Sequence, residues 1–344
     1  MTSQERVLVT GGAGFIGSHV VNRLHAEGHR VRVLEKPGTS TAHLPQQDVD
    51  VVFADLSYDD VLSDIADGCD VVLHLAANPN LWSANPEEFE QINHQGTRRV
   101  IAAACRAGAR NIVHVSTESI LCPADFNGVI NEKTETTLDD MIGDYCRSKW
   151  LAERAAFEAA EAGAPVVVVR PSVPVGPGDH RMGPFTRMVR DFAHGRIKAY
   201  LGGNLNFIDV RDVADGIWAA ARQGVPGQPY LLVSENWTIV EVLKYLSELT
   251  GHPAPRYQIP YSVALLFAYL EEGFSGVFAP NRTPMATVTG VKLTRRSFRF
   301  DGEQSAGNLG LPARRDCRQA IVDLVDFLRS KGQIPVPARP EADA

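Results

Sequence analysis

A glycine-rich turn near the start of the chain constrains the fold more than any other feature. The residues TGGAGFIG, at positions 10–17, follow directly on the apolar run Val7-Leu8-Val9, and an amphipathic helical pattern follows the turn. A buried strand that enters such a turn and continues as a helix places free N–H groups where phosphates bind. The glycines allow the tight turn, the close approach of a pyrophosphate and the packing of helix on strand. We therefore expect a dinucleotide to contact Gly11, Gly14, Phe15, Ile16 and Gly17.

Short apolar strands and helical patterns alternate over the first 171 residues. Strands are predicted at 6–10, 30–34, 49–54, 71–75, 111–116 and 166–170, and helices at 18–26, 58–66, 86–107 and 143–162. Continuous valine runs, as at 166–169, suit strands that are buried on both faces. The alternation predicts an α/β fold of the Rossmann type, with a doubly wound parallel sheet and helices on both faces, over residues 1–171.

The character of the sequence changes after residue 171, where Pro and Gly become dense and the segments shorten. We expect a smaller α+β substrate-binding lobe over residues 172–332, interleaved with the first domain, and a disordered tail over 333–344. The lobe is predicted to contain helices at 185–193, 210–222, 239–250 and 316–330 and a strand at 230–233. The apolar segment 260–278 is interpreted as a buried helix, with a substrate lid or a patch resting on a membrane as alternatives.

Charge and cysteine content narrow the class of protein. A formal net charge of −7 and a pI of about 5.8 give no sign of a nucleic-acid partner. Five scattered cysteines without a C-x-x-C pair argue against a disulfide framework and a metal site, and fit a reducing compartment. The first predicted strand leaves no room for a signal peptide, and no apolar run is long enough to span a bilayer. We therefore expect a cytoplasmic globular protein without a metal ion.

The end of the second predicted strand bears on the choice of cofactor. In a dinucleotide fold a carboxylate at this place accepts hydrogen bonds from the adenosine ribose and repels a 2′-phosphate, so Glu35 favours NAD. Lys36 follows at once and could pair with a 2′-phosphate, which keeps NADP as the alternative. Asp55, after the third strand, is interpreted either as a contact of the adenine amine or as a helix N-terminal acid. The small residues of His74-Leu-Ala-Ala77 let backbone pass close to the cofactor, whereas His74 itself is interpreted as a packed strand residue.

A tyrosine and a lysine four residues apart supply the chemistry. Tyr145 and Lys149 lie on one face of a predicted helix, and a cation near a phenol lowers the pKa of the phenol. Tyr145 can then move a proton to or from a carbinol oxygen while a hydride moves to or from the nicotinamide, and Lys149 also holds the nicotinamide ribose. The third member is a hydroxyl at a nearby strand end, where Ser116, Thr117 and Ser119 are available, and we choose Thr117 to polarise the carbonyl.

These residues together resemble the extended short-chain dehydrogenase/reductases of the NAD-dependent epimerase/dehydratase family, over residues 5–332. The matching motifs are TGGAGFIG, Asp55-Leu56, HLAA, the N-x-x-G-T that begins at Asn93, YCRSK and RPSVPVGPGD. The resemblance implies that Tyr145, Lys149 and Thr117 are catalytic, and that the chain forms a homodimer through the helices that hold Asn93 and Tyr145. It extends the expected cofactor contacts to Leu56, Leu75, Ala76, Ala77, Ser116, Pro171 and Val173.

The segments NLWSANPEEFEQIN, TLDDMIGDYCRSKWLAE, RPSVPVGPGD and GHPAPR carry a narrower resemblance. They resemble the group known as dihydroflavonol-reductase-like or hopanoid-associated sugar epimerases. Departures from the wider pattern limit the substrate. Val173 and Leu205 stand where nucleotide-sugar epimerases carry an Asn and an Arg for a diphosphate, and a buried diphosphate without such partners is costly. The Asp-Glu pair of dehydratases reads Glu118-Ser119, which weakens dehydration as well.

What remains is the oxidation of a secondary alcohol or the reduction of a ketone. Most candidate pocket residues are apolar, which suits a hydrophobic, polycyclic or lipid-like small molecule, although ordinary core is the alternative for each. An epimerase that retains its NAD and a non-catalytic dinucleotide sensor are the competing hypotheses. The candidate substrate residues are Trp82, Glu118, Ser119, Met141 and Phe185, beside Leu81, Ile142 and Met188.

Overall fold

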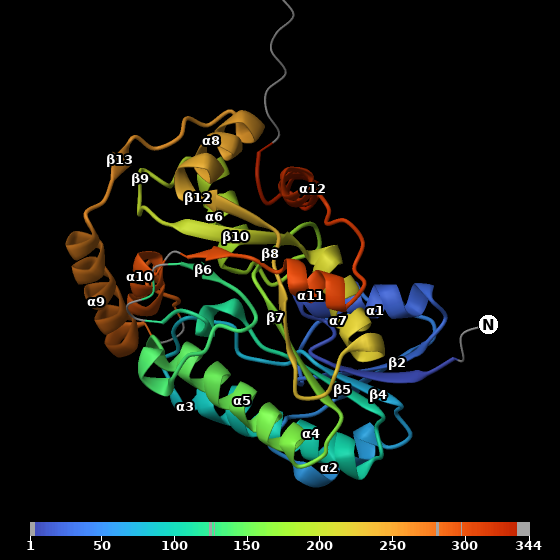
Figure 1. Cartoon of the computed structure of the whole chain (residues 1–344). Coiled ribbons are helices and arrows are strands. Elements are labelled where there is room, and N and C mark those ends of the chain that lie inside the picture. The colour runs from blue at the N-terminus through green and yellow to red at the C-terminus, as the bar shows by residue number, and fades with distance from the viewer. Residues whose placement is uncertain (1–3, 124–125, 127, 280–281, 297, 336–344) are drawn as a thin grey trace, which may run out of the picture.

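Seven parallel strands form the central sheet of the molecule (Figure 1). The computed structural model describes residues 4–123, 126, 128–279, 282–296 and 298–335. The sheet has the order β11-β7-β5-β4-β1-β2-β3. Its strands are β1 (Arg6–Thr10), β2 (Arg30–Glu35), β3 (Val49–Phe53), β4 (Val71–His74), β5 (Asn111–Val115), β7 (Val166–Pro171) and β11 (Pro229–Leu232). The predicted doubly wound Rossmann sheet is confirmed.

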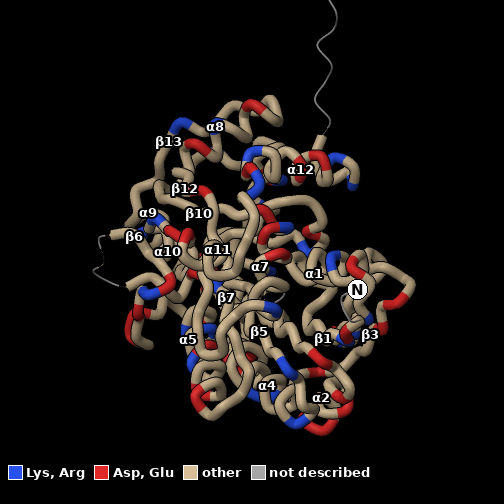
Figure 2. The backbone as a smooth tube through the Cα atoms, turned by 45° about the vertical axis from the view of Figure 1, so that its right-hand side comes forward, with Lys and Arg blue, Asp and Glu red and all other residues tan. Residues whose placement is uncertain are grey.

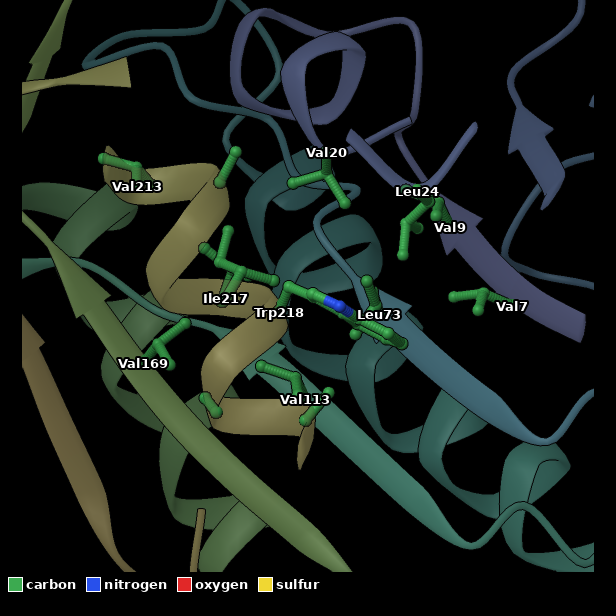
Figure 3. Close-up of a cluster of buried hydrophobic side chains, with 14 of the residues drawn as sticks. Val7, Val9, Val20, Leu24, Leu73, Val113, Val169, Val213, Ile217 and Trp218 are labelled. Atoms are coloured by element: carbon green, nitrogen blue, oxygen red, sulfur yellow. The ribbon is translucent and has the colours of Figure 1, made fainter. Parts of the chain in front are cut away.

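Successive side chains of the strands point to opposite faces of the sheet and belong to two separate cores, one on each face. Val7 and Val9 of β1 belong to the first core, which α1 (Phe15–Ala26) and α7 (Val210–Gln223) cover. Figure 3 shows this core, with Trp218 and Ile217 of α7 lying against the strands. Leu8 points to the opposite face, which is covered by α2 (Asp59–Ala66), α4 (Gly96–Arg106) and α5 (Gly143–Glu161). Burial on both faces explains why these strands consist largely of Val, Ile and Leu.

A second unit lies beyond the carboxyl ends of β7 and β11. Its three-stranded sheet has the order β12-β10-β8, with β8 (Val173–Val175), β10 (Asn204–Asp209) and β12 (Glu235–Thr238). A third core joins this sheet to α6 (Pro184–Ala193), α8 (Ile239–Thr250) and α12 (Cys317–Ser330). A capping box between Thr238 and Glu241 fixes the start of α8 at the predicted residue. The smaller elements are β6 (Val129–Ile130) with β14 (Arg299–Phe300), β9 (Ala199–Tyr200) with β13 (Tyr257–Gln258), α10 (Val288–Arg295) and α11 (Glu303–Asn308).

The structure corrects the assignment of two elements to the smaller lobe. The strand predicted at 230–233 is β11, which pairs with β7 at the edge of the large sheet. The helix predicted at 210–222 is α7, which packs against α1 on that sheet. The chain thus returns to the first domain after β10, and the reason is that β7 still offers an unpaired edge to a further parallel strand. The division at residue 171 remains a prediction about the two lobes.

The helix predicted at 86–107 is not uniform. It divides into α3 (Glu87–Phe89), a π-helical segment η1 (Glu90–Gln95) and α4. A π-helical turn inserts one residue into the helical repeat and rotates the side chains that follow. Local sequence gives no sign of this break because the apolar spacing on both sides remains helical.

The apolar segment after residue 260 forms a long helix, α9 (Tyr261–Phe278), but the helix is not buried. Eight of its large apolar side chains are 45% to 74% exposed, and only Ala264, Ala268 and Ser275 are buried. The expectation of a buried helix is therefore wrong. The reason is that α9 lies at the outer edge of the molecule (Figure 1) and packs on α10 through its inner side, where Ala264 and Ala268 are buried.

Charges of both signs are interspersed along the chain (Figure 2). Within the described ranges no helix is long and apolar enough to cross a membrane. Most of the predicted tail lies outside the described residues, which end at 335, and Ile334 is buried in the third core.

Candidate active site

The glycine-rich turn forms a cradle that larger residues would fill. Gly11 has a φ of +73°, and a Cβ there would lie 2.8 Å from the backbone nitrogen of Ala76. A Cβ on Gly17 would collide with the carbonyl oxygen of Gly11, where the helix meets the turn. Helix α1 begins at Phe15 without a side-chain cap, so the first-turn N–H groups lack partners within the helix. This cradle fits a dinucleotide pyrophosphate.

Glu35 ends β2 beside the cradle, where the adenosine ribose is expected. Its side chain is only 4% exposed, and Oε1 accepts a hydrogen bond of 2.6 Å from the backbone N–H of Ala13. Arg181, from the loop after β8, donates to Oε2 at 3.0 Å. Sequence reasoning missed Arg181 because it lies far along the chain from Glu35.

The other residues predicted to contact the cofactor differ in exposure and in hydrogen-bond partners. Asp55 accepts a hydrogen bond of 2.9 Å from the N–H of Ser57 in the turn before α2, which begins at Asp59 with Tyr58 as its N-cap. Lys36 is exposed, and Leu56 packs in the core beneath Gly96. Ala76 donates its N–H to the hydroxyl of Thr10 at 3.2 Å. The contact of Asp55 with an adenine amine stays a prediction.

The end of β5 and the start of α5 bring the catalytic candidates together. Tyr145 and Thr117 are hydrogen-bonded, and Tyr145 packs against Phe89 with ring centroids 6.5 Å apart. Lys149 is 4% exposed, and its Nζ donates a hydrogen bond of 2.8 Å to the carbonyl oxygen of Val115. Tyr145 and Thr117 thus lie together, and Lys149 of the same helix is anchored on the end of β5, at the carboxyl edge of the sheet where ligands bind in this type of fold.

The electrostatics of Tyr145 differ from the expectation. Burial raises the pKa of Tyr145 above its ordinary value, Cys146 and Glu118 raise it further, and the hydrogen bond with Thr117 offsets only part of the shift. The predicted lowering by Lys149 is therefore wrong for the protein alone. Burial also lowers the pKa of Lys149 to about 8, because an ammonium loses its hydration there.

Asn93 is a positioning residue that the motif contained but that sequence reasoning did not assign to the site. Its amide oxygen accepts from the N–H of Asn78 at 2.7 Å, and its Nδ2 donates to the hydroxyl of Ser148 at 3.0 Å. It thus ties the loop after β4 to the helix that carries Tyr145. The π-helical segment η1 places Asn93 there. His74 is a packed residue as expected, bonded to Thr10 and Thr97 and with its pKa lowered to about 3 by burial.

Glu118 lies next to the reacting groups. The hydroxyl of Thr117 donates to its Oε2 at 3.0 Å and lies 3.2 Å from the hydroxyl of Ser119. Burial raises the pKa of Glu118 to about 7, although these hydrogen bonds lower it in part. Ser116 is buried at the end of β5, and its hydroxyl has no partner among the described residues.

The raised pKa of Glu118 predicts a pH-dependent loss of stability. The unfolded carboxyl titrates near pH ~4.3, so between that value and the folded pKa of about 7 the folded protein holds a proton that the unfolded chain has lost. The contribution of protonated Glu118 to the free energy of unfolding is therefore complete at low pH and is lost as the pH rises. We expect Glu118→Gln to increase the free energy of unfolding by about 1–3 kcal/mol more at pH 8 than at pH 4.5. Denaturant unfolding measures this; Glu161→Gln, an exposed carboxyl, is the control. Equal effects at both pH values would refute it.

The predicted substrate residues separate into two groups. Met141 is buried in a cluster against which Tyr145 packs, together with Ile120 and Cys146. Trp82 is half-buried in the loop after β4. Phe185 instead packs against Phe207 with ring centroids 4.8 Å apart, in the third core. The structure therefore shows Phe185 as a core residue, which was the alternative interpretation.

Val173 and Pro171 occupy the strand ends near the junction of the two units. Val173 pairs with Phe207 across β8 and β10. Both Val173 and Leu205 pack on the third core. Arg211, the cation that follows in the sequence, is held by Asp209 and by Asp323 at 2.7 Å. The two positions that bind a diphosphate in nucleotide-sugar epimerases thus face apolar neighbours.

Comparison with known proteins decides the family. A sequence model described as "NAD dependent epimerase/dehydratase family" matches residues 7–232. The chain belongs to this family. It is an extended short-chain dehydrogenase/reductase, an oxidoreductase that uses NAD(P) and a small-molecule substrate, and the glycine cradle and the pair of Tyr145 with Lys149 fit that cofactor.

Three similar proteins cover almost the whole chain. "Putative dihydroflavonol 4-reductase" of Synechocystis is 33% identical over 95% of this chain and 95% of its own length. "Sterol demethylase protein B" of Methylococcus capsulatus is 33% identical over 95% of this chain and 99% of its own. The crystal structure of gox2253 is 30% identical, with a TM-score of 0.84 over 96% of this chain and 100% of that one.

Proposed function

We propose that this enzyme interconverts a secondary alcohol and a ketone on a hydrophobic, polycyclic or lipid-like substrate. The observation that carries the proposal is the apolar cluster against which Tyr145 packs, which includes Ile120, Leu121 and Met141 and receives Leu293 and Phe298. Apolar surroundings favour a substrate that brings few charges. The names of two similar proteins contain a dihydroflavonol and a sterol, and both are in keeping with such a substrate.

The roles of the side chains follow from their chemistry. When bound, the nicotinamide dinucleotide supplies or accepts a hydride. Tyr145 gives its phenolic proton to the carbonyl oxygen in reduction and takes the carbinol proton in oxidation. Thr117 donates a hydrogen bond to the same oxygen, and Lys149 holds the nicotinamide ribose. Glu118 accepts a hydrogen bond from Thr117, and burial raises the pKa of its carboxyl to about 7.

The first test is the cofactor content and turnover of the purified protein. Protein isolated without added nucleotide is denatured, and the released NAD(H) and NADP(H) are quantified. It is then assayed with NAD and with 3-hydroxysteroid and flavonoid alcohols. We expect largely empty protein and turnover of such an alcohol. Stoichiometric NAD together with interconversion of UDP-sugars would instead establish the NAD-retaining epimerase, and we infer against it from Val173 and Leu205.

We propose that NAD is preferred over NADP. The carboxylate of Glu35 is buried and anchored on the N–H of Ala13, where it repels a 2′-phosphate. We expect NADH to bind more tightly than NADPH, and Glu35→Ser to shift the ratio of the two Kd values toward NADPH by about 10-fold or more, which is about 1.4 kcal/mol. Fluorescence titration gives both constants. Arg181→Ala is the matched variant and is expected to strengthen the preference for NADH. If the wild type prefers NADPH and Arg181→Ala removes that preference, Arg181 binds a 2′-phosphate and the proposed preference for NAD is wrong.

We also propose that the chain forms a homodimer through α4 and α5, in the cytoplasm, where its free cysteines stay reduced. A groove of about 600 Å³ runs along these helices and is lined largely by small side chains. We expect Ala102→Arg, at an exposed position in the groove, to raise the dimer Kd more than about 10-fold. Light scattering after gel filtration measures this. Ala313→Arg, in an exposed loop, serves as control, and a dimer unaffected by Ala102→Arg would place the interface elsewhere.

A further inference from the structure

Helix α9 presents an apolar face to solvent, with its large side chains outward and its small ones inward. The buried residues are Ala264, Ala268 and Ser275, which pack toward α10. All exposed positions of α9 are apolar, glycine or a single serine. Surface helices of globular proteins ordinarily have the opposite pattern, and contiguous apolar patches mark a contact surface. The outward apolar residues, here called the α9 face, are Val263, Leu266, Phe267, Tyr269, Leu270, Phe274, Val277 and Phe278.

The two acidic residues of the helix do not reach this face. Glu271 is 15% exposed, accepts from the N–H of Met285 at 3.0 Å and forms an ion pair of 3.1 Å with Arg282. Glu272 accepts from the N–H of Val288 at 2.7 Å, at the start of α10. Both carboxylates are thus turned toward the protein and hydrogen-bonded there, which leaves the α9 face without a negative charge.

Cations lie beside the aromatic rings of the same helix over its whole length. The guanidinium of Arg295 lies 4.7 Å from the ring centre of Tyr261, the ammonium of Lys292 lies 6.0 Å from that of Tyr269, and Arg282 lies 5.9 Å from Phe274. The chain as a whole has a net charge of −7, yet the segment 253–300 contains six cationic and two anionic side chains. Local positive charge therefore follows the apolar face on a protein that is otherwise negative.

We propose that the α9 face docks on the surface of a lipid bilayer that contains anionic lipids, with α9 lying in the interface. An apolar face flanked by Arg and Lys matches the boundary between acyl chains and phosphate headgroups, because the rings enter the acyl region while the cations stay at the phosphates. A second copy of this chain fits the surface less well. A two-fold interface would place the same patch against itself and bring Arg282, Lys292 and Arg295 of one copy against those of the other.

The docking surface is continuous with the catalytic helix. Thr289 of α10 contacts Gly143, two residues before Tyr145, and Leu293 of α10 packs in the cluster that holds Tyr145. Docking would therefore bring the lipid boundary close to the catalytic centre. The proposal does not depend on the identity of the substrate, because it rests on the α9 face and its cations.

Vesicle flotation of the full chain tests the proposal. The vesicles contain phosphatidylcholine alone or phosphatidylcholine with phosphatidylglycerol. We expect binding to the anionic vesicles that weakens with salt, and a partition coefficient at least 10-fold lower for Leu266→Glu/Leu270→Glu. The control is Val61→Glu/Val225→Glu, which adds the same charge at two exposed valines elsewhere. Lys292→Glu/Arg295→Glu should abolish the preference for anionic over neutral vesicles.

A second measurement distinguishes loss of membrane binding from a folding defect in the variants. Phe267→Trp should show quenching by brominated lipids only when anionic vesicles are present, while the protein keeps the thermal midpoint of the wild type. Failure of the wild type to bind either kind of vesicle would overturn the proposal. So would a solution dimer that Leu266→Glu/Leu270→Glu converts to monomer, since the α9 face would then be a contact between two copies.

Discussion

Tyr145→Phe is expected to lower kcat by about 10²–10⁴-fold on any alcohol that the wild type oxidises, because it removes the group that transfers the proton. The substitution keeps the ring that packs against Phe89, so the fold and the Kd for NADH should stay within about 2-fold of the wild type. Stopped-flow and steady-state assays separate the two effects. A loss that falls on kcat and not on cofactor binding identifies a group that acts in the transition state.

The same experiment distinguishes catalysis from mere binding. Tyr58→Phe removes a phenol from an exposed position outside the site and should leave kcat unchanged. If Tyr145→Phe turned over its substrate at the rate of the wild type, the proton would come from another group, with Glu118 the first candidate. A protein without turnover whose biological activity survives Tyr145→Phe would be the dinucleotide sensor.

Arg170→Met is expected to lower the free energy of unfolding by about 3–5 kcal/mol, because it leaves the carboxylate of Glu153 buried without a partner. The two side chains are 7% and 4% exposed and form two hydrogen bonds, of 2.6 and 3.0 Å, between β7 and α5. Glu153 also raises the pKa of Lys149, against the effect of burial. The ion pair thus holds the catalytic helix on the sheet and favours the charged form of its lysine.

Two further variants show whether the effect arises from the unpaired charge. Arg170→Met/Glu153→Leu removes both charges and should recover most of the lost stability. Arg110→Met breaks ion pairs of an arginine that is 62% exposed, with Glu5 and Asp70, and should cost less than about 1 kcal/mol. Equal losses from Arg110→Met and Arg170→Met in denaturant unfolding would contradict the role assigned to burial.

Local patterns were sufficient for most of the fold and for the core of the candidate site. The bounds of β1 and α8 agree with the prediction to the residue, since an apolar run before a glycine turn and a Thr-x-x-Glu capping box are local signals. The spacing of Tyr145 and Lys149 placed both on one helix, and the strand-end hydroxyl of Thr117 lies beside Tyr145 as the motif implies.

Other features depend on contacts between distant segments, which no local pattern reports. Glu35 meets Arg181 because the loop after β8 folds back over the glycine turn. The pKa of Tyr145 rises because the phenol is buried, and the Lys149 ammonium hydrogen-bonds to the carbonyl oxygen of Val115. The apolar pattern of α9 specifies a helix equally well whether it is buried or exposed. Its large side chains are exposed because no element of the described ranges covers the outer side of the helix. Sequence periodicity sets which residues share a face, whereas the packing of the whole chain sets what that face meets.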